Sequence, residues 1–228
     1  MTRRINFKVQ LQDAQGQAIV TSGGVAMVCV NGSPLKHTIY SDAEGTAASN
    51  PKALTRGMIE FWVLQSAMTN DMVDLYIQCP GGQFLVARNL KQSGPNELTV
   101  DTDRAIHQYV LPYHITDYPA AVETDTGFDV PAANTAIVLP DAQGGTIRVT
   151  VVDATETLDV GTATAETGDP DGFMSAVALT TLGIVADDGA LLGTLAGHIS
   201  DGKSIVMTST AGSDTGQGYV YLTVELFN

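Results

Sequence analysis

The residues most suggestive of chemistry lie near the C-terminus, where residues 197–204 read Gly-His-Ile-Ser-Asp-Gly-Lys-Ser. This spacing matches the phosphate-binding loop, in which a strand precedes the loop and a helix follows it, so that backbone N–H groups face the phosphates. Here a β-branched run, Ile205 to Thr210, follows, and only 24 residues remain after Ser204. The sequence therefore predicts a glycine turn leading into an antiparallel strand, and no nucleotide site.

The remaining nucleophilic and metal-binding residue types form no known catalytic pattern. The four histidines are scattered, and none has the spacing of a helical zinc pair: His37, His107, His114 and His198. The chain also lacks a G-x-S-x-G elbow and an evident Cys/His nucleophile arrangement. We therefore expect a protein without enzymatic activity, with no catalytic residue, metal ligand or cofactor.

Two carboxylate pairs, Asp101/Asp103 and Asp169/Asp171, occur in segments typical of turns. The second pair belongs to an Asp-Pro-Asp-Gly stretch that could hold a hard cation, because Ca²⁺ takes carboxylate and carbonyl oxygens. The stretch lacks the later bidentate acid of a calcium loop. We therefore favour a plain turn and leave the cation as the alternative.

Three tyrosines and two cysteines allow a functional and a structural interpretation. Tyr109, Tyr113 and Tyr118 could stack on a sugar, but packing on a strand face is favoured. Cys29 and Cys79 lie in apolar alternating segments without a CxxC pair. Buried free thiols are therefore favoured over a disulfide or a metal site.

The composition indicates what kind of elements must carry these residues. Val, Ile and Thr number 22, 12 and 26, whereas Lys and Glu number only 5 and 7. Strand formers therefore dominate over residues typical of surface helices. Short alternating runs separated by turn signals every 8–12 residues predict an all-β protein with two β-sandwich or barrel-like (jelly-roll-like) domains.

The alternation predicts individual strands and two hairpins. The segment 72–77 is expected to pair with 84–87 across Pro80-Gly-Gly82, and 144–152 with 157–165 across 153–156. Residues 173–179 read as a strand or a short helix. The other predicted strands are 5–11, 25–30, 37–40, 58–63, 106–111, 135–139, 203–209 and 218–227.

The charge distribution divides the chain into two parts. Residues 1–114 carry nine basic and nine acidic residues, whereas residues 115–228 carry two and sixteen, which accounts for the whole net charge of −14. Residues 112–122 contain two prolines and lack periodicity. We therefore predict an N-terminal β-sandwich domain at 1–111, a linker at 112–122 and an acidic β domain at 123–228.

The same features disfavour nucleic-acid and membrane partners. A half-chain with fourteen excess negative charges repels phosphate. The positive residues at the start precede no apolar segment, and the most apolar stretch, 176–196, is interrupted by Asp187-Asp188 and by glycines. We expect a protein made in the cytoplasm that binds neither nucleic acid nor a membrane.

Two sets of motifs resemble known proteins. Residues 36–46 (Lys-His-Thr-Ile-Tyr-Ser-Asp-Ala-Glu-Gly-Thr), Asn50-Pro51, Gly57, Phe61, residues 73–84 and residues 93–102 are similar to a small β-sandwich in virion proteins of tailed bacteriophages. The second set resembles the β-rich half of phage head-decoration and tail-fibre-like proteins: residues 122–130, 158–161, 169–173, 211–215 and 218–221.

The resemblance implies a virion component without enzymatic activity, often trimeric. The chain has no coiled-coil or repeat shaft, which favours a capsid decoration (cement) protein over a long tail fibre. The implied partners are the major capsid protein and further copies of the chain. The implied location is the capsid surface, after synthesis in the bacterial host. The alternative is a tail- or head-fibre module that binds a host receptor or a carbohydrate.

Overall fold

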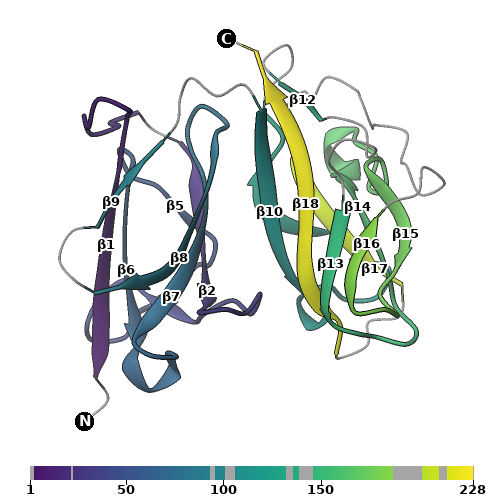
Figure 1. The fold of residues 1–228 in the computed structure, drawn as a ribbon, viewed down its shortest axis with the longest axis horizontal. Coiled ribbons are helices and arrows are strands. Elements are labelled where there is room, and N and C mark those ends of the chain that lie inside the picture. The colour runs from purple at the N-terminus through teal and green to yellow at the C-terminus, as the bar shows by residue number, and fades with distance from the viewer. Residues whose placement is uncertain are drawn as a thin grey trace. The chain divides into compact units, whose positions relative to one another are not determined.

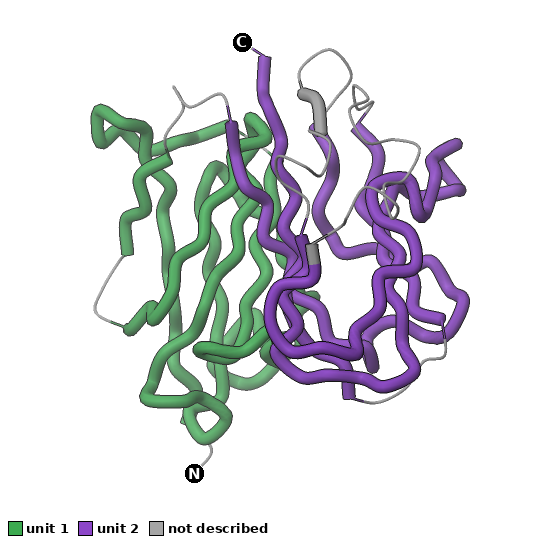
Figure 2. The backbone as a smooth tube through the Cα atoms, turned by 45° about the vertical axis from the view of Figure 1, so that its right-hand side comes forward, with its two compact units in different colours: residues 1–104 green, residues 105–228 purple. Residues whose placement is uncertain are grey.

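The structure, a computed structural model, describes residues 3–21, 23–92, 96–100, 106–131, 136–138, 146–186, 202–210 and 215–227. Within these ranges the backbone is mostly strand, as the sequence predicts (Figure 1). The helical segments there are short 3-10 turns: η1 (Gln65–Ala67), η2 (Ile115–Asp117) and η4 (Thr164–Glu166). The chain divides into two compact units, residues 1–104 and 105–228 (Figure 2).

Unit 1 is built from two sheets. The first has the strand order β4 (Ala47–Ala48), β3 (Ile39–Tyr40), β6 (Met58–Leu64), β1 (Arg4–Gln12), β9 (Asn96–Thr99). The second has the order β5 (Lys52–Ala53), β2 (Val25–Val30), β7 (Met72–Gln78), β8 (Phe84–Lys91). Pairing is antiparallel except between β1 and β9, which run parallel.

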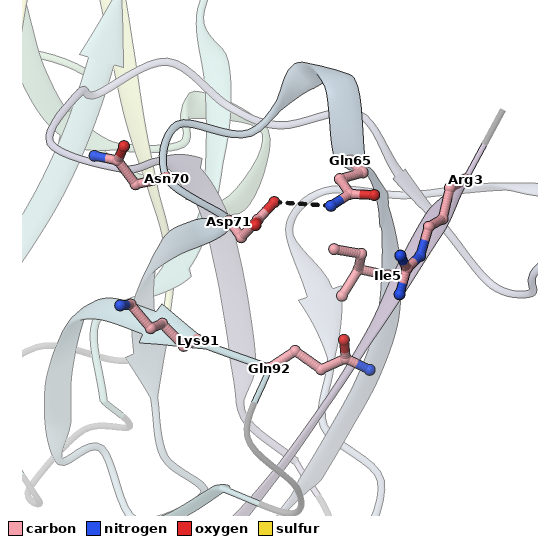
Figure 3. Close-up of a pocket in the computed structure, with 7 residues that line it drawn as sticks. All are labelled: Arg3, Ile5, Gln65, Asn70, Asp71, Lys91 and Gln92. Carbon is pink, nitrogen blue, oxygen red and sulfur yellow. Dashed lines mark hydrogen bonds between the residues drawn. The ribbon is translucent and has the colours of Figure 1, made fainter.

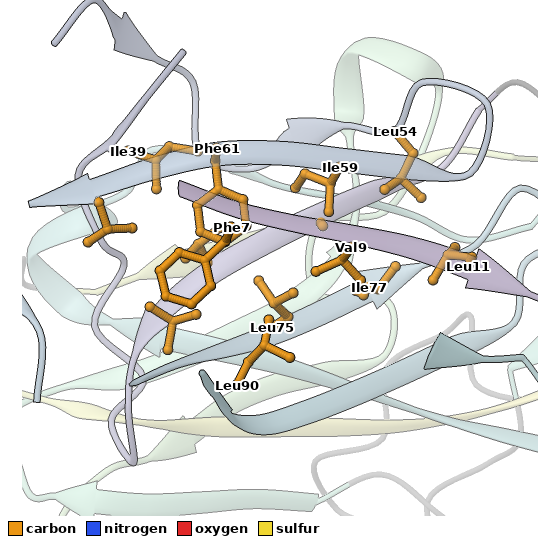
Figure 4. Packing of buried hydrophobic residues seen from close by; sticks show 14 of the residues in the cluster. Phe7, Val9, Leu11, Ile39, Leu54, Ile59, Phe61, Leu75, Ile77 and Leu90 are labelled. Atoms are coloured by element: carbon orange, nitrogen blue, oxygen red, sulfur yellow. The ribbon is translucent and has the colours of Figure 1, made fainter. Parts of the chain in front are cut away.

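The core of unit 1 follows from the alternation of its strands. In β1, every second residue from Ile5 to Leu11 is buried, which places one face of the strand in the core. Phe7 and Phe61, directly opposite each other in the β1–β6 ladder, stack with ring centroids 5.3 Å apart. Leu75 and other side chains of the second sheet belong to the same buried cluster (Figure 4). The two sheets therefore form a sandwich.

Unit 2 also contains two sheets. One has the strand order β10 (Ile106–His114), β18 (Gln217–Leu226), β13 (Thr146–Val151), β16 (Gly183–Ala186), and β12 (Ala136–Val138) also pairs with β18. The other has the order β11 (Thr124–Asp129), β17 (Ser204–Ser209), β14 (Thr157–Thr162), β15 (Met174–Ala178). The described pairs within both sheets are antiparallel.

The boundary between the units lies upstream of the predicted linker. The chain divides between residues 104 and 105, and β10 pairs with β18 along nine residues. The expected domain 1–111 and linker 112–122 are therefore wrong in position, since Ile106 to His114 form one strand of unit 2. The linker was predicted partly because of Pro112, which lies within β10. A strand at the edge of its sheet tolerates proline, and β10 ends the order of the sheet.

The predicted hairpin of 144–152 with 157–165 does not form. β13 pairs with β16 and β18, whereas β14 pairs with β15 and β17 in the other sheet. The chain crosses between the sheets at a turn that is held by buried Asp153. Its carboxylate accepts hydrogen bonds from the Thr155 N–H at 3.0 Å and the Thr215 hydroxyl at 2.9 Å.

Most other strand predictions are confirmed. β2 spans the predicted residues, β7 and β8 pair as the expected hairpin, and 173–179 contains strand β15. β8 and β10 extend three to four residues beyond their predicted ends. Among the described residues, no helix has the length and apolar character needed to cross a bilayer.

Candidate functional site

Unit 1 carries an open polar hollow of about 400 Å³ (Figure 3). Ile5, which is only 5% exposed, provides an apolar side chain in its lining, flanked by Arg3 and Gln92. Asn70 and Lys91 point away from Ile5 on the far side of Asp71. The lining residues are Arg3, Ile5, Gln65, Asn70, Asp71, Lys91 and Gln92.

Strand ends and a tight turn position these residues. Asn70 and Asp71 both have φ of 56°, the left-handed region that the central residues of a type I′ hairpin turn require. This turn directly precedes β7. The Gln65 side-chain amide donates a hydrogen bond to the Asp71 carboxylate at 3.2 Å, and the Gln65 N–H donates to the Arg3 carbonyl at 3.0 Å. These bonds connect the turn with the start of β1.

The charges of the hollow favour an anionic partner group. Arg3 and Lys91 supply two positive charges, whereas Asp71 is the one carboxylate among the lining residues. The amides of Gln65 and Gln92 add groups that can both donate and accept hydrogen bonds. Because the charged side chains are exposed, salt screens their attraction for a partner. The hollow suits a carboxylate-bearing surface and provides no nucleophile activated by a neighbouring base.

The glycine loop at 197–204 is described only at its end. Residues 197–201 lie outside the described residues, and β17 begins at Ser204. The prediction that a strand follows Lys203 is therefore confirmed. Lys203 donates a hydrogen bond through Nζ to the Thr167 carbonyl at 3.0 Å, a contact that anchors η4. The absence of nucleotide binding stays a prediction.

The histidines occupy separate positions in the fold. His37 is buried, and burial lowers the pKa of its imidazole. His107 is buried within β10, and His114, at the end of β10, contacts the Thr116 hydroxyl through Nδ1. His198 lies outside the described residues. In the part of the chain that the structure describes, no three His, Cys, Asp or Glu side chains gather as metal ligands would.

The Asp169/Asp171 pair lies in the loop before β15. A hydrogen bond between the two carboxyl groups and partial desolvation of the Asp171 carboxyl raise the pKa of Asp171, and the Ser175 hydroxyl donates to Asp171 at 3.1 Å. The backbone closes a turn through the Gly172 N–H to the Asp169 carbonyl at 3.1 Å. The predicted turn is therefore present, and the absence of a cation there stays a prediction. Asp101 and Asp103 lie outside the described residues.

The tyrosines and cysteines have the structural role that the sequence favours. Tyr109, Tyr113 and Tyr118 are at most 1% exposed, so none presents a ring to a ligand at the surface. Cys29 and Cys79 are buried free thiols, and burial raises the pKa of the Cys79 thiol to about 12. A thiol with so high a pKa is a poor nucleophile near neutral pH.

Sequence reasoning did not identify the hollow. The Asn70-Asp71 dipeptide is a recognisable turn signal, but nothing local connects it with Arg3 or Lys91. Arg3 is far from this turn in sequence and reaches it because β1 and β6 pair. Lys91 reaches it because it lies opposite Met72 in the β7–β8 ladder.

No protein-family model matches the chain, and no curated protein matches it significantly. A crystal structure of the major pilin subunit of Bacillus cereus aligns with 98% of this chain at 9% sequence identity, with a TM-score of 0.23. The aligned chain spans 59% of that pilin. A TM-score this low does not establish a common fold.

Proposed function

We propose that this protein is a non-enzymatic virion component of a tailed bacteriophage. In this proposal it binds the outside of the capsid through unit 1 and stabilises the expanded shell. The observation that carries the proposal, together with the motif resemblance, is the division of charge between the units. Unit 1 contains nine basic and nine acidic residues, whereas unit 2 contains two and sixteen.

Because of this division, the two units differ in the electrostatic cost of binding to the capsid shell. A balanced surface approaches a shell of either sign at little electrostatic cost, and the hollow adds two exposed cations that can meet acidic side chains. Fourteen excess negative charges are most stable in water, where ions screen them over about 8 Å at physiological salt. Unit 1 is therefore the better candidate for anchorage, and unit 2 for the solvent side.

Stabilisation then follows from interface burial. An interface of about 1,600 Å² supports affinities from micromolar to picomolar. Many symmetric copies act on one shell, so moderate individual contacts add up to strong resistance against opening.

Sedimentation with undecorated, expanded capsids tests the proposal. The full-length chain is expected to pellet with the shells. The variant Arg3→Glu/Lys91→Glu, which reverses both cations of the hollow, should bind about tenfold more weakly. Arg56→Glu/Arg88→Glu is the control, because it reverses two exposed cations of unit 1 that do not line the hollow.

Two results would contradict this function. One is a wild-type chain that stays in the supernatant at micromolar concentration with correctly expanded shells. The other is equal binding by the hollow variant and the control, which would show that the anchorage lies elsewhere.

A further inference from the structure

The outer face of the first sheet of unit 1 carries a row of aromatic and amide side chains. Tyr40 in β3 lies opposite Trp62 in β6, and Trp62 lies opposite Asn6 in β1. On the adjacent rung Glu60 lies opposite Lys8. We call these five residues the outer-face cluster.

The alternation of the strands places this cluster away from the core. In β6, Ile59, Phe61 and Val63 are buried, whereas Trp62 is half-buried and Glu60 is exposed. Residues opposite each other in antiparallel strands have Cβ atoms about 5 Å apart, so the phenol, the indole and the amide are direct neighbours. The cluster shares no residue with the hollow of unit 1.

Contacts with neighbouring groups hold the cluster in place. The Arg4 guanidinium lies over the Tyr40 ring at 4.6 Å from its centroid and donates a hydrogen bond to the Ala43 carbonyl at 3.0 Å. The Asn6 amide donates to the Glu60 carboxylate at 3.1 Å. A rigid strand framework with side chains already bonded to one another loses little conformational entropy on binding.

We propose that the outer-face cluster binds a neutral sugar chain, with one sugar ring stacked on Trp62. A pyranose ring has a face of C–H groups that packs against an aromatic ring, and its hydroxyls both donate and accept hydrogen bonds. Asn6 and Tyr40 offer both donor and acceptor groups, Glu60 accepts, and Lys8 donates. The cluster therefore offers a stacking surface and the polar partners that sugar hydroxyls need.

Other classes of ligand fit this cluster less well. The charges of Lys8 and Glu60 balance, and Arg4 over the Tyr40 ring leaves a single excess positive charge, which gives only weak attraction for a polyanion such as nucleic acid. The middle of a sheet face offers no free backbone edge, since β6 is paired on both sides by β1 and β3. A peptide could not add to the sheet there as a further strand.

The experiment begins with the full-length protein on an array of neutral hexasaccharides that includes glucans, mannans, galactans and N-acetylglucosamine chains. The hexasaccharide with the strongest signal is then titrated while tryptophan emission is recorded. Trp62 is the one tryptophan of the chain, so any change in emission reports on this cluster. We expect saturable binding with a shifted emission maximum.

Three variants make the outcome specific. Trp62→Ala and Asn6→Ala should each weaken array binding at least about tenfold, whereas Trp62→Phe, which keeps a ring, should lose less. Phe227→Ala is the control, because it removes an exposed aromatic side chain in unit 2. Thermal unfolding shows whether each variant is folded. If Trp62→Ala does not fold, Asn6→Ala and Trp62→Phe still test the site.

Sugar binding and capsid binding are measured with different variants and can give separate results. The inference is overturned where no hexasaccharide binds, or where folded Asn6→Ala and Trp62→Phe bind as well as Phe227→Ala. If these cluster variants instead reduce sedimentation with capsids while no sugar binds, the sheet face is a protein contact and the sugar site is wrong. Capsid anchorage by the hollow is measured separately with the Arg3/Lys91 variant.

Discussion

At the scale of single residues, the side-chain amide of Asn50 makes hydrogen bonds to backbone groups that a neighbouring strand would otherwise make. Its Oδ1 accepts a hydrogen bond from the Val28 N–H at 2.9 Å, and its Nδ2 donates to the carbonyls of Val28 at 2.7 Å and His37 at 2.8 Å. One amide thereby satisfies three backbone groups of β2 and the segment before β3. The Asn-Pro pair that contributes to the phage resemblance thus has a structural role in this chain.

We expect Asn50→Ala to lower the free energy of unfolding by about 2–4 kcal/mol, because the Val28 N–H and the His37 carbonyl lose the Asn50 amide as a partner, whereas the Val28 carbonyl still accepts from the His37 N–H at 2.9 Å. Urea unfolding monitored by circular dichroism measures the effect. Gln92→Ala, which truncates an exposed amide, is the control and should change stability by less than about 0.5 kcal/mol. Equal urea midpoints for the two variants would disprove the role assigned to Asn50.

His37 makes the stability of unit 1 depend on pH. Burial lowers the pKa of His37 from 6.5, so the folded state binds a proton less readily than the unfolded state does. The resulting contribution of His37 to the free energy of unfolding is present above pH 6.5. It is lost as the pH falls from there toward the pKa of His37 in the folded state.

Wild type should therefore lose more stability than His37→Gln between about pH 7.5 and about pH 5.5. Glutamine stays uncharged at both pH values, so the His37→Gln variant shows how much stability is lost for reasons other than His37. Urea midpoints at the two pH values measure the difference. An equal loss in both proteins would show that His37 does not control stability in this range.

At the scale of elements, the turn after β3 explains a motif that looks like a family signature. The Asp42 carboxylate accepts hydrogen bonds from the N–H groups of Gly45 at 2.8 Å and Thr46 at 2.9 Å. Hydrogen bonds from Thr46, Gly45 and Ser41 lower the pKa of Asp42 to about 2. Gly45 has φ of 100°, and a Cβ there would meet the Arg4 guanidinium. The Ser-Asp-x-x-Gly-Thr pattern therefore encodes a turn.

A second element-scale feature is the close approach of the 168–172 loop to β14. A Cβ at Gly161 would clash with the Asp169 carbonyl oxygen, and backbone cannot yield as a flexible side chain can. We expect Gly161→Ala to destabilise unit 2 by about 1–3 kcal/mol. At Gly16 a Cβ meets no atom, and a substitution is opposed only by its φ of 77°.

Gly16→Ala should accordingly cost about 1 kcal/mol or less. Thermal unfolding of both variants compares the two costs. A larger loss of stability for Gly16→Ala than for Gly161→Ala would contradict the proposed packing of this loop on β14.

Strand existence was predictable because alternation is a local signal, whereas partner choice was predictable only where a short turn joins two strands, as between β7 and β8. The period of two in β1 reports directly which residues face the core. Whether β13 continues into a hairpin depends on the turn at Asp153 and on competition from β18, which is distant in sequence. The hollow could not be predicted for the same reason, since Arg3 and Lys91 line it together with Asp71 only because sheet pairing brings their strands together.

At the scale of the whole molecule, the composition favours self-association. Apolar residues make up 44% of the chain and charged residues 16%, and the described surface still exposes large side chains such as Leu182 and Ile184. Closed cyclic symmetry would protect strand edges from open-ended association. Because the phage virion proteins that the motifs resemble are often trimeric, we predict a homotrimer, with a light-scattering mass of three 23.9-kDa chains or threefold density on particles. A monomer mass at micromolar concentration, with no threefold density, would refute it.

An electron cryomicroscopy map of shells mixed with the full-length chain tests the proposed capsid decoration directly. We expect density on the outer surface of the expanded capsid, with unit 1 against the shell and the acidic unit 2 toward solvent. Density in which unit 2 contacts the shell would contradict the predicted polarity. Density confined to the tail, or no density on the particle, would contradict the decoration function itself.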